Sequence, residues 1–247
     1  WDLYQRGLWH ENRITRADNA TAIELFSKAI ALDQEFARPY AGLSECYTYD
    51  VFYGYAKRDP SDIFTPARKA VEIDPKDGNA HRALGWAYTF HREHSSAIAE
   101  LKIAIGLNPN EAHSYAFLGF AQAYSGLVEE ALASFRSAIN LSPQHPFFGW
   151  FHAGMALALL LSQRHEESVE WARKALQYPN TPWLTRLHFL SALGHLGRHE
   201  EAAKALVDLL VVQPACTISF VEPRLPFTDD AYRDHHFEGL RKAGMPE

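Results

Sequence analysis

The chain has 247 residues, and its formal net charge of −6 with no basic run argues against electrostatic binding of nucleic acid. The longest strongly apolar stretch, 155–161, is far shorter than the roughly 18 residues of a membrane-spanning helix, so we expect no transmembrane segment. These properties predict a soluble chain whose length allows one or two domains.

Residues 1–34 carry the first copy of a helical pattern. Tyr4 and Gly7 lie one helical turn apart, and Ala22, Phe26 and Ala29 form a second stripe further along the chain. Two such stripes separated by a short polar stretch predict two antiparallel helices joined by a turn.

Residues 35–75 repeat this pattern with an insertion. The first stripe runs through Tyr40, Leu43 and Tyr47, and the second resumes at Ile63. The chain between them is about seven residues longer than in the other copies, and the surplus falls in the aromatic-rich range 49–60. This range either lengthens the first helix, with its tyrosines packed on the next copy, or forms a lid over one face.

Residues 76–143 hold the two clearest copies, which are 34 residues apart. A Leu-Gly pair, small residues where two helices cross, a large apolar residue and a closing proline recur in register. A 34-residue period with this content is typical of the tetratricopeptide repeat, a pair of antiparallel helices, and the chain resembles that family. The matching positions are Leu84, Gly85, Tyr88, Ala97, Leu101, Ala104 and Pro109 in one copy and Leu118, Gly119, Gln122, Ala131, Phe135, Ala138 and Pro143 in the next.

Two looser copies, at 144–180 and 181–214, bring the predicted number to six. The first of them follows a surplus around 145–148, and Asn180 stands at its end where most copies have proline. After Pro214 the pattern stops, and residues 215–247 are predicted as an extension with a C-terminal capping helix that has Thr228 as its N-cap. We therefore predict an all-α fold, a right-handed α-solenoid of about six repeats at 1–34, 35–75, 76–109, 110–143, 144–180 and 181–214.

The first helix of each repeat lines the concave surface in tetratricopeptide proteins, and the resemblance therefore predicts a binding groove. In this chain the corresponding positions are rich in aromatic and aliphatic residues. Exposed contiguous apolar surface usually marks a contact site, so we expect the groove to take an amphipathic helix or an apolar peptide. Self-association as a homodimer and filling by the chain's own C-terminal segment are the alternatives. The predicted groove residues are Arg82, Trp86, Phe90, Phe120, Tyr124, Trp150, Leu157 and Leu161.

No pattern in the sequence predicts catalysis, a metal site or a cofactor. The histidine pairs His195/His199 and 235–236 lack accompanying cysteines and metalloprotease motifs, so we interpret them as turn or surface residues. Cys46 and Cys216 lie 170 residues apart, which in a solenoid is too distant for a disulfide. Two reduced thiols favour a cytoplasmic location and leave a periplasmic one open.

Segments near both ends of the chain are similar to a narrower family. They are Leu3–Gly7, Ala22–Asp33 with Phe36–Ala37, and Phe237–Glu247. They resemble the C-terminal tetratricopeptide region of bacterial class III adenylate cyclases and of related winged-helix transcriptional regulators. The resemblance implies a non-catalytic interaction or dimerising module of a bacterial signalling protein, with any catalytic or DNA-binding domain upstream. Two other functions stay open: the substrate-recruiting arm of a peptide- or sugar-modifying enzyme, and a sensor of small apolar ligands.

Overall fold

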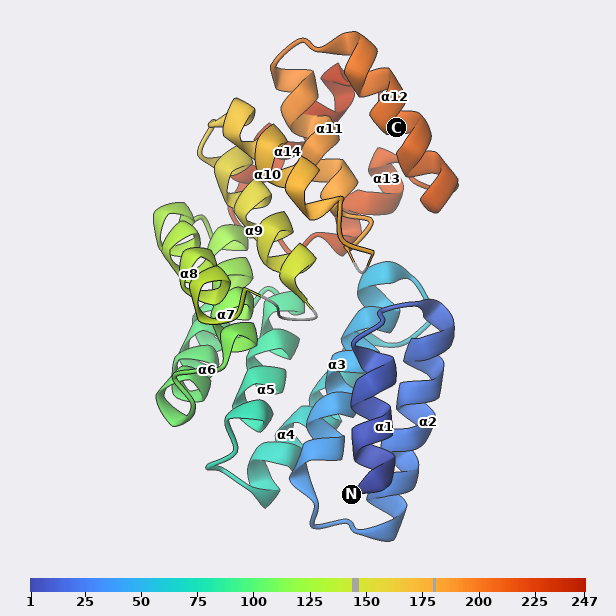
Figure 1. Cartoon of the computed structure of the whole chain (residues 1–247), viewed down its shortest axis with the longest axis vertical. Helices are drawn as coiled ribbons and strands as arrows, with labels where there is room; N and C mark the ends of the chain where they lie inside the picture. The colour runs from blue at the N-terminus through green and yellow to red at the C-terminus, as the bar shows by residue number, and fades with distance from the viewer. Residues whose placement is uncertain (144–146, 180) are drawn as a thin grey trace. The chain divides into compact units, whose positions relative to one another are not determined.

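The computed structural model describes residues 1–143, 147–179 and 181–247 (Figure 1). Every regular element in these ranges is a helix, which confirms the predicted all-α class. The chain divides into two compact units, Trp1–Ala121 and Gln122–Glu247, and each is described by itself. The surplus predicted around 145–148 falls partly outside the described residues, and the boundary residue Asn180 falls wholly outside them.

The first unit consists of successive helix pairs. The helices of a pair are joined by a short turn, except that α3 and α4 are joined by residues 54–63, and the second helix of each pair ends shortly before the next pair begins. Its elements are α1 (Asp2–Glu11), α2 (Arg16–Leu32), α3 (Ala37–Tyr53), η1 (Pro60–Ile63), α4 (Phe64–Ile73), α5 (Gly78–Phe90), α6 (His94–Leu107) and most of α7 (Ala112–Tyr124).

The second unit continues the same plan and then departs from it. After the last helix pair, a short helix, a 3₁₀ turn and a final helix complete the chain. Its elements are the end of α7, α8 (Val128–Leu141), α9 (Phe148–Leu161), α10 (His165–Ala175), α11 (Thr185–His195), α12 (His199–Val212), α13 (Ile218–Val221), η2 (Glu222–Arg224) and α14 (Asp230–Lys242).

One residue with left-handed backbone follows the first helix of each of the six pairs, α1/α2 to α11/α12. Glycine adopts this conformation without steric cost, whereas other residues adopt it at a cost because Cβ approaches the following carbonyl oxygen. Arg92 and Gly126 occupy the same position one repeat apart, so the turn geometry repeats even where the residue type does not. The six residues are Ile14 (φ 50°), Gly54 (67°), Arg92 (60°), Gly126 (87°), Gln163 (60°) and Gly197 (67°).

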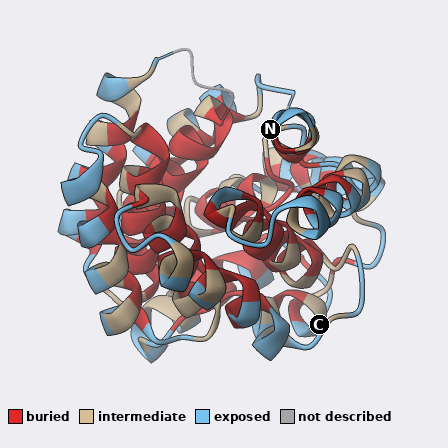
Figure 2. Ribbon diagram, turned by 90° about the horizontal axis from the view of Figure 1, so that it is seen from below, coloured by how far each residue is buried: buried red, intermediate tan, exposed pale blue. Residues whose placement is uncertain are grey.

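Small residues at the repeat positions let the helices cross closely, as the sequence predicted. The Phe26 ring of α2 lies between Gly7 of α1 and Gly42 of α3, where an added Cβ would come within 2.5 Å and 2.6 Å of ring carbons. Gly85 of α5 faces Leu101 of α6 in the same way. Buried residues accordingly follow the helix faces that meet, and exposed ones follow the outward faces and turns (Figure 2).

The insertion in the second repeat lengthens a helix. α3 continues to Tyr53, and Tyr49, Phe52 and Tyr53 are all buried. The Phe52 ring packs on Phe90 of α5 at 4.7 Å between centroids, which places the extra turns against the next repeat. Of the two alternatives for this range, the structure has the longer helix.

The C-terminal segment lies along the first helices of the repeats of its unit. α14 packs on α11 and also contacts α9, and the Thr228 amide donates a hydrogen bond to the Tyr124 carbonyl oxygen at 3.1 Å. α14 begins one residue later than the sequence predicted, because the N-cap is Asp229 rather than Thr228: its carboxylate accepts hydrogen bonds from the amides of residues 231 and 232. The segment therefore covers the side of the second unit on which the sequence placed the groove.

Candidate functional site

The predicted groove residues are packed rather than exposed. Trp86 is 1% exposed and Leu157 0%, and Phe120, Tyr124, Trp150 and Leu161 are also buried. Phe90 and Arg82 are half-buried. The expectation of a continuous exposed apolar surface at these positions thus differs from the structure. As a partner-binding site, the groove stays a prediction.

In the first unit, aromatic packing between repeats accounts for this burial. The Trp86 ring of α5 stacks on Phe117 of α7 with 3.9 Å between centroids and 12° between planes. Phe90 and Phe120 meet the same indole at 4.8 Å and 5.9 Å. Rings at adjacent groove positions therefore fill the space between successive first helices.

In the second unit, the C-terminal segment packs on one of the predicted positions and on the helix that carries three others. The Phe227 ring meets Tyr124 edge to face at 5.0 Å, and α14 lies against α9, the helix that carries Trp150, Leu157 and Leu161. Burial raises the pKa of the Tyr124 hydroxyl above its ordinary value. The contact of Phe227 with Tyr124 is of the kind expected if the chain's own segment fills the groove, and the three alternatives stay open.

Arg82, the predicted groove cation, is held in an ion network inside the first unit. Its guanidinium donates to Glu45 Oε1 at 2.9 Å and lies 3.3 Å from Glu111 Oε1. Burial raises the pKa of Glu45 and the adjacent guanidinium opposes that rise, while burial and the Glu45 carboxylate raise the pKa of Glu11. Arg82 neutralises buried acids, a role that its groove position alone did not predict.

An open cleft lies elsewhere on the first unit, between α2 and α4 over α3. Its volume is about 760 Å³. We call it the α2–α4 cleft. Ile30 and the α3 residues Tyr40, Leu43 and Tyr47 give it an apolar lining, and Arg68 and Lys69 of α4 stand among its polar residues. It thus combines an apolar lining with charge in a recess large enough for a peptide segment or a small molecule.

Arg58, from the segment after α3, orders one side of this cleft. Its guanidinium lies 3.5 Å from the centre of the Tyr47 ring and donates two hydrogen bonds to Asp50 Oδ2, at 3.1 Å and 2.9 Å. The aromatic ring and the carboxylate fix the guanidinium from two sides. The insertion predicted from the sequence therefore contributes to this cleft through Arg58, although its tyrosines pack in the core.

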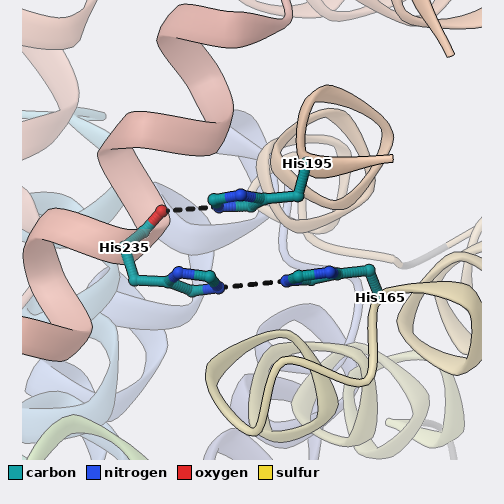
Figure 3. Close-up of side chains that lie close together, drawn as sticks. All are labelled: His165, His195 and His235. Atoms are coloured by element: carbon teal, nitrogen blue, oxygen red, sulfur yellow. Dashed lines mark hydrogen bonds between the residues drawn. The ribbon is translucent and has the colours of Figure 1, made fainter. Parts of the chain in front are cut away.

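Three histidines from separate helices meet in the second unit (Figure 3). His165 begins α10, His195 ends α11, and His235 lies in α14. One ring nitrogen of each lies within 4.8 Å of the other two. The sequence predicted no metal site, because the three are far apart along the chain and only His195 and His235 belong to the pairs considered. The position of His165 and His195 at helix ends beside turns is the signal that the sequence offers.

Comparisons with known proteins identify the repeat. Residues 112–145 match the model of the tetratricopeptide repeat family. A comparison with curated proteins finds no match. Among solved structures, a thermophilic tetratricopeptide protein of Thermus thermophilus is 19% identical with a TM-score of 0.61, over 78% of this chain and 97% of that chain.

Two further structures share the fold over most of this chain. Pseudomonas aeruginosa pilF is 16% identical with a TM-score of 0.57, over 87% of this chain and 92% of its own. The human IFIT1 dimer with PPP-AAAA is 16% identical with a TM-score of 0.67, over 94% of this chain and 56% of that one. At such identities the likeness concerns the fold alone. Residues 112–145 thus match one tetratricopeptide repeat, and the chain has the all-helical fold of the tetratricopeptide structures that it resembles, as the sequence predicted. Among the described residues, no helix is long and apolar enough to span a membrane.

Proposed function

We propose that this chain is a protein-interaction module that binds an amphipathic peptide in the α2–α4 cleft. The repeat fold is one that commonly supports protein interaction, and the open cleft is the observation that carries the proposal. Its volume of about 760 Å³ is that of a binding site rather than a packing defect. The predicted groove, by contrast, offers little free surface in the described residues.

The lining of the cleft suggests the chemistry of its partner. Tyr40, Leu43 and Ile30 can accept apolar side chains, while Arg68 and Lys69 stand on the α4 side. A short helix with one apolar face and acidic residues beside it would satisfy both parts. Glu72 pairs with Lys69 at 3.0 Å, so Arg68 is the residue best placed to steer an acidic partner.

Peptide selection against the full chain tests this proposal. We expect peptides from a random library to lose at least about tenfold in affinity with Tyr40→Ala and with Arg68→Glu, which remove an apolar contact and reverse a charge. Arg136→Glu is the matched control, because Arg136 is an exposed arginine of α8 in the other unit. Selected peptides that bind all three variants equally would contradict the cleft as the site.

Two further measurements separate the other candidate sites and ligands. NMR shift changes confined to residues around Trp150 and Leu157 would favour the predicted groove over the cleft. Stabilisation by small apolar molecules but by no peptide would favour the sensor function, which the size of the cleft also fits.

We infer the wider context from the resemblance to the region found in bacterial adenylate cyclases. It supports a regulatory or dimerising part of a signalling protein, non-catalytic itself and cytoplasmic. The buried, unpaired thiols of Cys46 and Cys216 fit a reducing compartment. Sedimentation across a concentration series tests the dimer, and a strict monomer at the highest concentration would count against it.

A further inference from the structure

Three imidazoles converge where α10, α11 and α14 meet. The rings of His165 and His235 face each other edge to edge, with 3.1 Å between their Nε2 atoms (Figure 3). The His195 ring stacks on His235 with 4.0 Å between centroids and on His165 with 4.6 Å. All three side chains are half-buried, so solvent ions can reach them.

A hydrogen bond to the backbone fixes one nitrogen of the His195 ring and leaves the other available. His195 Nε2 donates to the His235 carbonyl oxygen at 2.9 Å, so Nδ1 carries the lone pair of that ring. The Nε2 atom of His235 faces Nε2 of His165 at 3.1 Å, so these two nitrogens share one proton and binding an ion there would replace that hydrogen bond. Histidines that bind metals usually donate their other N–H to a backbone carbonyl or a carboxylate, as His195 does, because the bond fixes tautomer and ring orientation.

We propose that His165, His195 and His235 bind a divalent transition-metal ion of the Zn²⁺ type, one ring nitrogen each. Imidazole is a good ligand for this class of ion, and three histidines with a fourth position open to water are a known zinc arrangement. The ion would tie the C-terminal helix α14 to the last two repeats.

Binding the ion requires side-chain rearrangement within the cluster. Ligand nitrogens about 2.0–2.1 Å from a tetrahedral ion lie about 3.3 Å from one another, close to the 3.1 Å that separates Nε2 of His165 and His235. His195 must also turn its ring out of the stack on His165 and His235, because the lone pair of an imidazole lies in the ring plane and the stacked planes are nearly parallel; the three nitrogens now lie within 4.8 Å of one another. His165 must carry its proton on Nδ1, a change of tautomer that loses no proton.

The surrounding charges permit a cation. Burial, with the neighbouring histidines, lowers the pKa of His165 to about 4, and burial also lowers that of His235. The three cations of α14 are each paired with an acid: Arg233 with Asp230 and Asp234, Arg241 with Glu247, and Lys242 with Glu238 at 2.8 Å. The Glu238 carboxylate interacts favourably with His195 and His235, and adds negative charge one turn from His235.

Titration of the full chain with Zn²⁺ or Co²⁺ alone tests this site. We expect one ion per chain, an upward shift of the melting temperature, and a Co²⁺ absorption spectrum of the four-coordinate type. His165→Ala, His195→Ala and His235→Ala should each weaken binding by more than about tenfold. His199→Ala is the control, because His199 is exposed and begins the next helix, and it should bind as the unaltered chain does.

A second measurement keeps the test valid if a histidine variant does not fold. X-ray absorption of the zinc-loaded, unaltered chain should show about three nitrogen ligands of imidazole type at about 2.0–2.1 Å. Absence of stoichiometric binding, equal loss with His199→Ala, or folded single variants that bind with unchanged affinity would overturn the proposal.

Discussion

The glycine of the repeated Leu-Gly pair shows how closely successive helices must cross. A Cβ atom on Gly85 of α5 would come within 2.6 Å of Leu101 Cγ and 3.1 Å of the Ala97 carbonyl oxygen. Leu101 is fully buried and Cγ is its branch point, so α5 and α6 must separate to make room. Gly106 of α6 is the matched control, because nothing lies within 4 Å of the atom that alanine would add there.

Alanine at these two glycines should change the free energy of unfolding differently. Alanine favours a helix over glycine by about 0.5–1 kcal/mol, and Gly106→Ala should gain an amount of that order. Gly85→Ala gains the same preference and loses about 1–3 kcal/mol to overpacking. Because the helix preference cancels in the comparison, Gly85→Ala should be about 1–3 kcal/mol less stable than Gly106→Ala.

Urea unfolding followed by far-UV circular dichroism measures this difference. In a packed core, Leu→Ala costs about 2–5 kcal/mol. In the Gly85→Ala background, Leu101→Ala also removes the clashing atoms, so its cost should be smaller there. Equal stability of the two glycine variants, or the same cost of Leu101→Ala in both backgrounds, would refute the close crossing.

Three further variants test the buried polar and aromatic contacts. Arg82→Met should destabilise the first unit by about 3–5 kcal/mol in urea unfolding, because it leaves the Glu45 carboxylate buried without its partner, and adding Glu45→Gln should restore part of the loss. Burial lowers the pKa of His152 from 6.5 to about 4, so the unfolded chain takes up this proton first and stability should fall as pH drops through that interval. His152→Phe should show a shallower fall, and an identical pH profile would show that the histidine stays solvated. Phe227→Ala should loosen the C-terminal segment from Tyr124 and speed amide exchange in α14, whereas unchanged exchange would mean that the ring contributes little.

The sequence was sufficient to predict the helix pairs because each repeat carries its own packing information. The positions of Gly85 and Leu101 indicate which faces meet, and a period of 34 residues indicates how often. The same period predicts where the turns fall. Arg92 and Gln163 have left-handed backbone in two of these turns, where a glycine would have been the clearer sequence signal. Local spacing therefore determines most of the repeat.

The candidate sites depend on contacts that repeat spacing does not encode. Arg82 occupies a groove position, but its partner Glu45 comes from the preceding repeat. His165, His195 and His235 meet only because α14 packs on α11, where Gly194 and Gly239 bring the two helices together. The repeat period of the sequence gives no signal for this packing, because α14 lies outside the repeats. Predicting the sites would have required knowing where the final segment docks.

The left-handed residues in the turns offer a simple means of tuning heat tolerance. Gln163 holds a mirror-image backbone conformation at φ 60° that costs an L-residue about 1–2 kcal/mol, whereas Gly126 and Gly197 hold equivalent positions without that cost. Glycine at position 163 would remove the penalty and lose about 0.5–1 kcal/mol through the greater freedom of the unfolded chain. The remaining gain can be introduced one turn at a time, away from the α2–α4 cleft.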